Sequence, residues 1–153
     1  MVEQLISLKR VQLDDSNSLT EILNLINGDE ELQNVFSGQK NTMTRLLNAS
    51  YVAFIQNKNQ NIGFVMIVNN ERTNTQEVDM GILEDFRNLG YGTKALELLK
   101  EVVEKNRIMV EVQIQNTNML AIRTVEKNGC KLIRQTEEYN YYVFDFSEGD
   151  KTI

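Results

Sequence analysis

The sequence predicts an α/β fold in which a mixed, partly antiparallel central sheet of about seven strands is flanked by helices. Three observations lead to this prediction. Short β-rich segments are interleaved with longer segments whose apolar residues recur at helical spacing. Two of the β-rich segments flank a turn-like stretch, which is typical of an antiparallel hairpin. Late in the chain a strand, a helix and a further strand follow one another, which indicates a sheet that is only partly antiparallel.

The N-terminal half is expected to contain a strand, helical segments and a hairpin, in that order. Residues 4–13 (QLISLKRVQL) are predicted to form the first strand. A helix follows, and its apolar stripe consists of Leu19, Ile22, Leu23 and Ile26. The pair Asn27-Gly28 predicts where this helix ends. Two shorter helical segments are expected around residues 32–36 and 43–47, and residues 51–70 are predicted to form the hairpin around the turn NKNQN.

The C-terminal half is expected to alternate strands and helices. Residues 76–83 (QEVDMGIL) are predicted to form a strand. One face of it carries Val78, Met80 and Ile82, and the other carries Glu77, Asp79, Gly81 and Leu83. The next helix ends near Asn106, and its apolar stripe consists of Ala95, Leu98, Leu99, Val102 and Val103. The remaining elements are a strand over 108–114, a helix over 118–129 that is capped by Asn128-Gly129, and a hairpin of residues 130–135 and 141–146.

The composition excludes several kinds of site. The chain has 153 residues, a net charge of −6 and no histidine. A histidine general base, a histidine-bearing catalytic triad and a histidine-ligated metal are therefore excluded, and we expect no metal site. The acidic charge argues against a nucleic-acid partner, whose binding needs a basic surface. It mildly favours cationic partners such as amines, although solubility alone also accounts for it.

Length and apolar patterning are typical of a soluble globular protein. We expect a single domain over residues 1–153. No apolar run approaches the roughly 18 residues of a membrane span, and the N-terminal stretch MVEQLISLKRVQ does not resemble a signal peptide. Cys130 is the single cysteine, so an internal disulfide is ruled out and a reducing, cytoplasmic location is expected.

The stretch ILEDFRNLGYGTKA, residues 82–95, combines a Gly-x-Gly turn with the start of a predicted helix. Such a turn offers backbone N–H groups and the positive end of the helix dipole, so a phosphate or pyrophosphate is its natural ligand. A tight turn without a ligand is the alternative. The P-loop signature is absent. The dinucleotide-binding fingerprint matches GYGTKA, with Glu111 near its acidic position, but residues 84–89 separate the strand from Gly90, which that fingerprint does not allow.

Two motifs give the chain a resemblance to a known family. Residues 87–92 (RNLGYG) resemble the [QR]-x-x-G-x-[GA] signature of the GNAT superfamily, the acyl-CoA-dependent N-acyltransferases. One strand later such proteins carry, on a helix, N-x-x-A, a tyrosine and E-K-x-G-F. Here residues 118–121 (NMLA) are followed by Val125 and by residues 126–130 (EKNGC). The resemblance covers almost the whole chain, most weakly its first 50 residues, and it implies the GNAT fold.

The resemblance implies how acetyl-CoA, the cosubstrate, is held. In this family the coenzyme A pyrophosphate lies on the backbone amides of the turn, and the pantetheine arm pairs with the end of the preceding strand. The matching turn residues here are Arg87, Asn88, Leu89, Gly90, Tyr91 and Gly92, with Thr93 able to add a hydroxyl. The matching strand residues are Ile82 and Leu83. Asn118 matches the family asparagine that contacts the pantetheine, and a simple helix cap is the alternative for this residue.

The resemblance also implies direct attack of an amine on the acetyl thioester, assisted by a general base and by backbone N–H groups at the oxyanion. Family bases are commonly a Glu or Asp on the strand before the turn, so Asp79 is the first candidate and Glu77 the second. Solvated strand charges are the alternative for both. The helix tyrosine that often serves as the acid is Val125 here, and a hydroxyl of the last hairpin is the candidate replacement. The hairpin tyrosines are Tyr139, Tyr141 and Tyr142, of which Tyr141 is retained as the candidate catalytic residue.

The function expected from this resemblance is acetyl transfer from acetyl-CoA to a primary amine. The acceptor is either a small-molecule amine or a protein N-terminus or lysine, and its identity is not readable from the sequence. A GNAT-like module that binds acyl-CoA without catalysis is the alternative. Cys130 stands where the family usually has phenylalanine, and we expect it to be a buried apolar residue and not a nucleophile. A homodimer is a possible assembly, because dimers are frequent among similar proteins.

Overall fold

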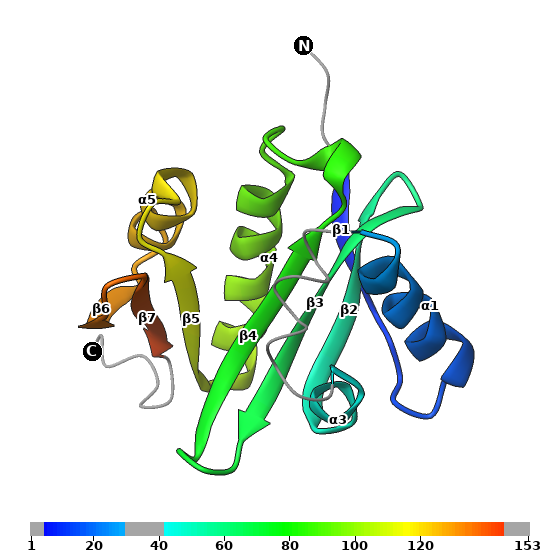
Figure 1. The fold of residues 1–153 in the computed structure, drawn as a ribbon, viewed down its shortest axis with the longest axis horizontal. Helices are drawn as coiled ribbons and strands as arrows, with labels where there is room; N and C mark the ends of the chain where they lie inside the picture. Colours follow the sequence, from blue (N-terminus) through cyan, green and yellow to red (C-terminus); the bar gives the residue numbers. More distant parts are fainter. Residues whose placement is uncertain (1–4, 30–41, 146–153) are drawn as a thin grey trace.

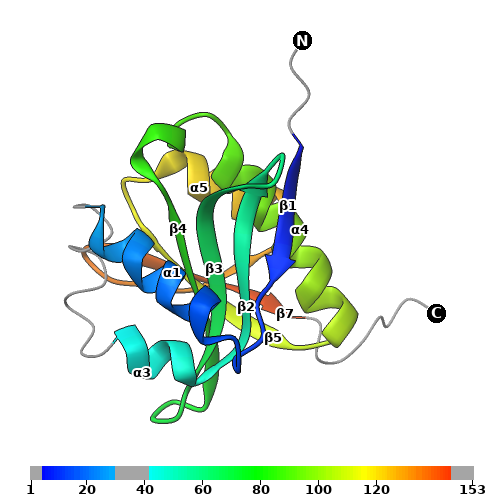
Figure 2. The same ribbon diagram turned by 90° about the vertical axis from the view of Figure 1, so that its right-hand side faces the viewer.

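The computed structural model describes residues 5–29 and 42–145, and within these ranges it shows a seven-stranded mixed sheet with helices on both faces (Figures 1 and 2). The strand order is β1-β2-β3-β4-β5-β7-β6. The pair β4–β5 is parallel, and the other five neighbouring pairs are antiparallel. This architecture confirms the predicted fold class.

The elements follow the predicted order of strands and helices. In the first half they are β1 (Ile6–Arg10), α1 (Ser16–Asn27), α3 (Thr42–Leu47), β2 (Ala49–Asn57) and β3 (Gln60–Asn70). In the second half they are β4 (Thr75–Ile82), a 3-10 turn (Glu84–Phe86), α4 (Tyr91–Asn106), β5 (Met109–Gln115), α5 (Met119–Lys127), β6 (Lys131–Gln135) and β7 (Tyr139–Asp145). The helical segment predicted around residues 32–36 lies outside the described residues.

Element boundaries differ from the prediction at the N-terminal end. The first strand ends before the predicted residue 13, because its ladder with β2 ends at the pair Arg10–Ala53. Residue 4 of the prediction lies outside the described residues. Helix α1 begins before its first stripe residue, at Ser16, because Asp15 caps it: the carboxylate accepts from the Ser18 N–H (3.1 Å) and from the Ser18 hydroxyl (2.8 Å). These two bonds hold the pKa of Asp15 below its ordinary value.

Two apolar cores lie on opposite faces of the sheet. Figure 2 shows the sheet between α1 and α3 on one side and α4 on the other. The core under α4 and α5 includes Ala95, Leu99, Val103, Val110, Val112, Val125, Tyr142 and Phe144. The core under α1 and α3 includes Leu19, Ile22, Ile26, Leu46, Phe54, Phe64 and Met66. Because β3 is covered on both faces, residues 62–68 of it are all buried and carry no apolar–polar alternation.

Strand β4 separates two different environments. Val78, Met80 and Ile82 pack against the core under α4 and α5, as predicted from the alternation of the sequence. The other face of β4 carries Glu77 and Asp79, which lie on the side of α1 and α3. The alternation of residues along β4 therefore places its apolar side chains in the core and its two carboxylates on the opposite face.

Strands β4 and β5 separate before either one ends. Their ladder consists of three residue pairs, from Gln76–Val110 to Val78–Val112. Beyond these pairs β4 continues to Ile82 and β5 continues to Gln115 without pairing to each other. Figure 1 shows the two strands diverging towards the end of the sheet at which α4 begins. Asp79 is the first residue of β4 after the last pair, so it lies where the strands part.

The close approach of β3 and β4 depends on Gly63. A methyl group at this position would collide with the carbonyl oxygen of Gly81 and would press on the backbone of Ile82. Since the obstacles are backbone atoms, the collision can only be relieved by spreading the two strands. We expect Gly63→Ala to lower the free energy of unfolding by about 3 kcal/mol, at the upper end of the usual cost of overpacking. Urea unfolding measures this loss.

Gly92→Ala is the matched control for this measurement. The nearest atom to a methyl group at this position is the Ile82 Cγ1, at 3.8 Å, which is an ordinary contact. Gly92 also lies in the first turn of α4, where alanine is the better helix former. The control is therefore expected to unfold at the wild-type urea concentration or slightly above it. Equal stability of Gly63→Ala and wild type would contradict the packing argument.

Candidate active site

The turn before α4 has an uncapped helix N-terminus. Asn88 (φ 62°) and Gly90 (φ 86°) both adopt the left-handed conformation, and Gly90 is the N-cap residue without a side-chain bond to the helix. The first helical hydrogen bond joins the Lys94 N–H to the Gly90 carbonyl (3.1 Å). The N–H groups of Tyr91, Gly92 and Thr93 therefore lack a helical partner, and they lie at the positive end of the α4 dipole. This is the geometry that binds a phosphate group.

An ion pair holds this turn against the opposite side of the fold. The Arg87 Nη2 lies 2.8 Å from the Asp29 Oδ1, and the Arg87 Nε donates to the Ile82 carbonyl (2.8 Å). The second oxygen of Asp29 accepts from the Glu84 N–H (3.0 Å). Asp29 lies just after α1 and is only 7% exposed. The Arg87 side chain is thus committed to the protein. Its backbone N–H, the predicted pyrophosphate donor, also has a protein partner, because it donates to the Glu84 carbonyl (3.2 Å).

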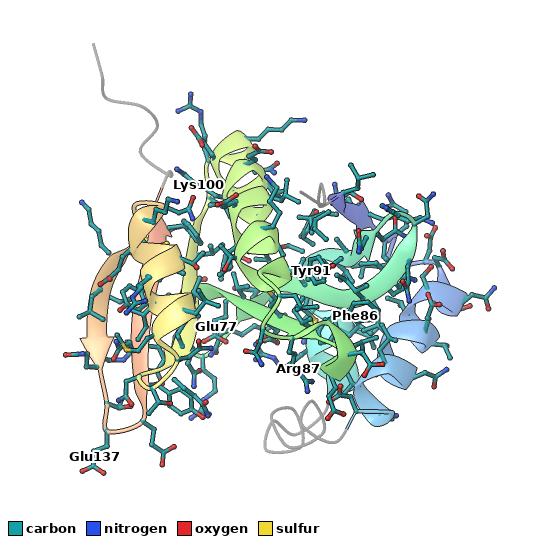
Figure 3. The ribbon with its side chains drawn as sticks, turned by 90° about the horizontal axis from the view of Figure 1, so that it is seen from above. Glu77, Phe86, Arg87, Tyr91, Lys100 and Glu137 are labelled. Carbon is teal, nitrogen blue, oxygen red and sulfur yellow. The ribbon has the colours of Figure 1, made fainter. Side chains whose placement is uncertain are left out.

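The Tyr91 side chain also packs onto the protein. Its hydroxyl accepts from the Asn57 Nδ2 (3.3 Å), and its ring is tilted against Phe86 with a centroid distance of 6.2 Å. Figure 3 shows Phe86, Arg87 and Tyr91 grouped around the turn. These contacts fix both sides of the turn.

The Thr93 hydroxyl is engaged between two helices. It lies 3.1 Å from the Thr124 hydroxyl, and Thr124 itself donates to the Leu120 carbonyl (2.8 Å). A hydroxyl has one proton, so Thr93 is the donor of this pair and ties α4 to α5. The expected bond from Thr93 to a pyrophosphate would require this proton to turn away from Thr124.

Asn118 caps α5. Its Oδ1 accepts from the Ala121 N–H (3.2 Å), which is the helix-cap role considered for this residue. The cap uses only the amide oxygen, and the side-chain N–H groups stay available for a pantetheine carbonyl. The cap and the predicted coenzyme contact are therefore compatible.

The predicted pantetheine edge of β4 is partly occupied by protein bonds. The Ile82 carbonyl accepts from Arg87, and the Leu83 N–H donates to the Ile62 carbonyl (2.9 Å). A carbonyl oxygen has two lone pairs, so Ile82 retains one acceptor site. The contact of Ile82 and Leu83 with a pantetheine arm stays a prediction.

Both candidate bases on β4 bind the same arginine. The Arg45 Nε lies 2.7 Å from the Asp79 Oδ2, and the Arg45 Nη2 lies 3.3 Å from the Glu77 Oε1. The second oxygen of Glu77 accepts from the Asn70 Nδ2 (3.3 Å). The Asp79 side chain is 9% exposed, against 30% for Glu77. Sequence analysis missed Arg45, because a single arginine in a short helix carries no sign of a partner 34 positions later.

Burial raises the pKa of Asp79 above its ordinary value. The hydrogen bond and the charge of Arg45 oppose this shift, and the neighbouring charge of Glu77 adds to it. The pKa of Arg45 is itself raised, because its two carboxylate partners outweigh the effect of burial. Asp79 is therefore a buried carboxylate with a strengthened affinity for a proton, which is the property a general base needs.

Strand β5 lies across the strand gap from β4, and β7 is the next strand beyond β5. Glu111 lies directly opposite Glu77 in the β4–β5 ladder, and on the same face Gln113 lies opposite Tyr141. Tyr141 is half-buried, and the guanidinium carbon of Arg134 lies 4.0 Å from the centre of its ring. Asp79, Glu77 and Tyr141 thus share one face of the sheet, with β5 between the strands that carry them.

The remaining candidate groups belong to the core. The side chain of Tyr142 points to the opposite face, where it is 1% exposed and its hydroxyl accepts from the Asn140 Nδ2 (3.2 Å). Val125 lies on the buried face of α5 and is fully buried. Cys130 is buried as expected, and burial raises the pKa of its thiol to about 12, so the thiol stays protonated at neutral pH.

Two further findings concern the described residues. No three Asp, Glu, Cys or His side chains among them converge into a metal-binding group. Within the same ranges, every helix is too short or too polar to cross a membrane.

Solved structures with a similar fold are acetyltransferases. The dodecameric spermidine N-acetyltransferase from Vibrio cholerae superposes with a TM-score of 0.64 at 14% identity, over 94% of this chain and 95% of that one. The ribosomal L7/L12 α-N-protein acetyltransferase RimL, solved with coenzyme A, gives 0.62 at 13% identity over 97% and 98%. The N-acetyltransferase PseH from Campylobacter jejuni gives 0.55 at 16% identity over 92% and 98%.

Sequence comparison gives the family directly. No curated protein sequence matches the chain. The model of the Acetyltransferase (GNAT) family, however, matches residues 18–130, which is well over half of the chain. This range includes the turn before α4, both β4 carboxylates and the whole of α5. The chain therefore belongs to the GNAT acetyltransferase family.

Proposed function

We propose that this chain is a cytoplasmic, single-domain N-acetyltransferase that moves an acetyl group from acetyl-CoA to a primary amine. One observation carries the proposal: β4 leaves β5 at Asp79, a buried carboxylate, and its continuation leads through the 3-10 turn to the uncapped N-terminus of α4. The helix N-terminus suits a pyrophosphate and the carboxylate suits proton transfer. Family membership and the acetyltransferases of similar fold support the same chemistry.

The proposed binding mode assigns one role to each part of the site. The N–H groups of residues 91–93 bind the pyrophosphate, and the turn from Arg87 to Gly90 shapes its approach. The edge of β4 at Ile82 and Leu83 pairs with the pantetheine arm, and Asn118 contacts it from α5. The acetyl thioester then lies between the strands, beside Asp79.

The proposed reaction is direct transfer without an acyl-enzyme intermediate. The amine nitrogen attacks the thioester carbon, and Asp79 accepts a proton from that nitrogen. Backbone N–H groups at the strand gap stabilise the oxyanion. The C–S bond then breaks, the carbonyl re-forms, and coenzyme A leaves as a thiolate. A thiol has a pKa of about 8.5, so the thiolate is a fair leaving group, and the Tyr141 hydroxyl is the candidate donor for its protonation.

The charges of the site favour a cationic acceptor. Glu77, Asp79 and Glu111 share the face that an acceptor must cross, and Arg45 neutralises only part of their charge. A small polyamine fits this face, and spermidine is the substrate named for a structure of similar fold. A protein N-terminus is the second acceptor class, because a protein acetyltransferase also shares the fold. Turnover of acetyl-CoA with spermidine, an N-terminal peptide and a lysine peptide tests both.

A binding module without catalysis is the second candidate function. The observation that favours it is Val125, which places a buried hydrocarbon side chain where many family members have a catalytic tyrosine. Thiol release from acetyl-CoA in the presence of the acceptor panel separates the two candidates. Binding of acetyl-CoA without release of coenzyme A for any acceptor would support the module.

Coenzyme binding is expected to stabilise the fold. A ligand present at about 100 times its dissociation constant adds roughly 2.7 kcal/mol to the free energy of unfolding, so acetyl-CoA should raise the melting temperature by several degrees. NAD(H) should not, because the dinucleotide fingerprint fails here. Gly90→Val is the control: its φ of 86° strains any side chain, so the shift with acetyl-CoA should be lost. A larger shift with NAD(H) would overturn the coenzyme assignment.

The Asp29–Arg87 pair is expected to support coenzyme affinity through the turn. Asp29→Asn removes the buried charge that faces Arg87 and should destabilise the fold by about 3–5 kcal/mol, the usual cost of breaking a buried pair. We also expect coenzyme A to bind about tenfold more weakly, measured by calorimetry well below the melting temperature. The control is Asp85→Asn, an exposed carboxylate of the same turn. Unchanged affinity in the folded Asp29 variant would show that the turn holds its shape without the pair.

Asp79→Asn is expected to remove the base while it preserves the size of the side chain. The loss in kcat should be about 10²–10⁴-fold, with the affinity for coenzyme A nearly unchanged. Glu77→Gln is the matched control on the same face and should cost much less. Full turnover of Asp79→Asn together with collapse of Glu77→Gln would reverse the ranking of the two carboxylates. If both variants kept full activity, neither carboxylate would be the base.

A further inference from the structure

We propose that Arg45 is a positioning residue for acetyl transfer, which fixes the carboxylate of Asp79 at the strand gap and holds it in its charged form. The inference rests on the proposed function, in which Asp79 accepts the amine proton. Arg45 itself comes from α3, which is separate from the strands that form the gap.

The geometry of the pair fixes the direction in which Asp79 points. The short bond from the Arg45 Nε occupies Oδ2 (2.7 Å), and the described residues offer no hydrogen-bond partner to Oδ1. The backbone of α3 at Arg45 is held in place, because the next residue, Leu46, is fully buried in the core under α1 and α3. One oxygen of the carboxylate is thus anchored, and the other is left to receive a proton.

The surroundings of Asp79 explain why it needs a cation. Met66 of β3 lies directly opposite it and offers no polar group. Glu77 on the same strand is a like charge, and Glu111 of β5 lies opposite Glu77. Among the described residues, Arg45 is the one positively charged side chain that bonds to Asp79. Without Arg45, burial and Glu77 would both favour the protonated carboxyl, and a protonated carboxyl cannot act as a base.

The discriminating experiment is the pH dependence of kcat/KM in Arg45→Gln, with Arg45→Lys and Glu77→Gln alongside. An opposite charge within bonding distance lowers a carboxyl pKa by about 1–3 units. In Arg45→Gln the acid limb should therefore move to higher pH by about that amount. Below the limb, kcat/KM should fall about 10- to 1000-fold, while the alkaline plateau stays near wild type. Arg45→Lys should restore most of the wild-type limb.

Glu77→Gln gives a prediction of opposite sign. It removes a like charge beside Asp79, so its acid limb should move to lower pH. A limb caused by titration of the acceptor amine stays at the same pH in all four proteins, so a shift between variants reports the enzyme. If Arg45 only held α3 to the sheet, Arg45→Gln would instead lower activity by the same factor at every pH. That result would overturn the proposal.

A titration of the Asp79 carboxyl carbon by NMR tests the inference independently of turnover. The Asp79 resonance is assigned from its absence in Asp79→Asn, and Arg45→Gln should raise its midpoint. An unchanged midpoint in a folded Arg45→Gln protein would sink the role given to Arg45. If wild type turned over no amine, the proposed function would fail, and the NMR midpoints would still decide whether Arg45 controls the charge of Asp79.

Discussion

The early separation of β4 and β5 is the constraint on which the site depends. Parallel neighbours in a sheet normally bond along their shared length, but this ladder stops after Val78 and Val112. Beyond that pair the two edges do not bond to each other within the described residues, so an extended ligand can pair with the edge of β4 there. The same separation exposes one end of the sheet to α4, whose N-terminus points to it. The early end of the β4–β5 ladder thus separates the two strands and frees backbone edges with which a ligand can pair.

Two charged contacts between distant segments hold β4 and the turn that follows it. Asp29, after α1, binds Arg87 and the Glu84 N–H, and so it fixes the turn that leads into α4. Arg45, in α3, binds both carboxylates of β4. Both contacts reach from the N-terminal helices to the strand and turn of the family motif. The N-terminal part of the chain, in which the family resemblance is weakest, therefore controls the geometry of the part in which it is clearest.

Val125 stands where the family often has a tyrosine that serves as the acid, and this changes which group can protonate the leaving thiolate. The fully buried hydrocarbon side chain of Val125 on α5 cannot donate a proton. Cys130, the next unusual residue, keeps its own proton because burial raises the pKa of its thiol. On the same face of the sheet as Asp79, the strand beyond β5 carries Tyr141, with the guanidinium of Arg134 over its ring. In the proposed reaction any proton donor therefore comes from the last hairpin and not from α5.

The sequence by itself determined the order of the elements, the two faces of β4, the Gly-x-Gly turn and the family. Each of these depends on short patterns of residues that are close together in the sequence. It also placed Asp79 and Glu77 on one face, since a strand alternates with a period of two. Only the tertiary structure decided that Arg45 binds both of them, that Asp29 binds Arg87, and that Tyr141 shares their face. These partners lie 32 to 58 positions apart along the chain or on strands joined only through the sheet. Local periodicity carries no information about contacts between residues so far apart in sequence. Those contacts depend on the order of the strands and on the point at which β4 and β5 separate.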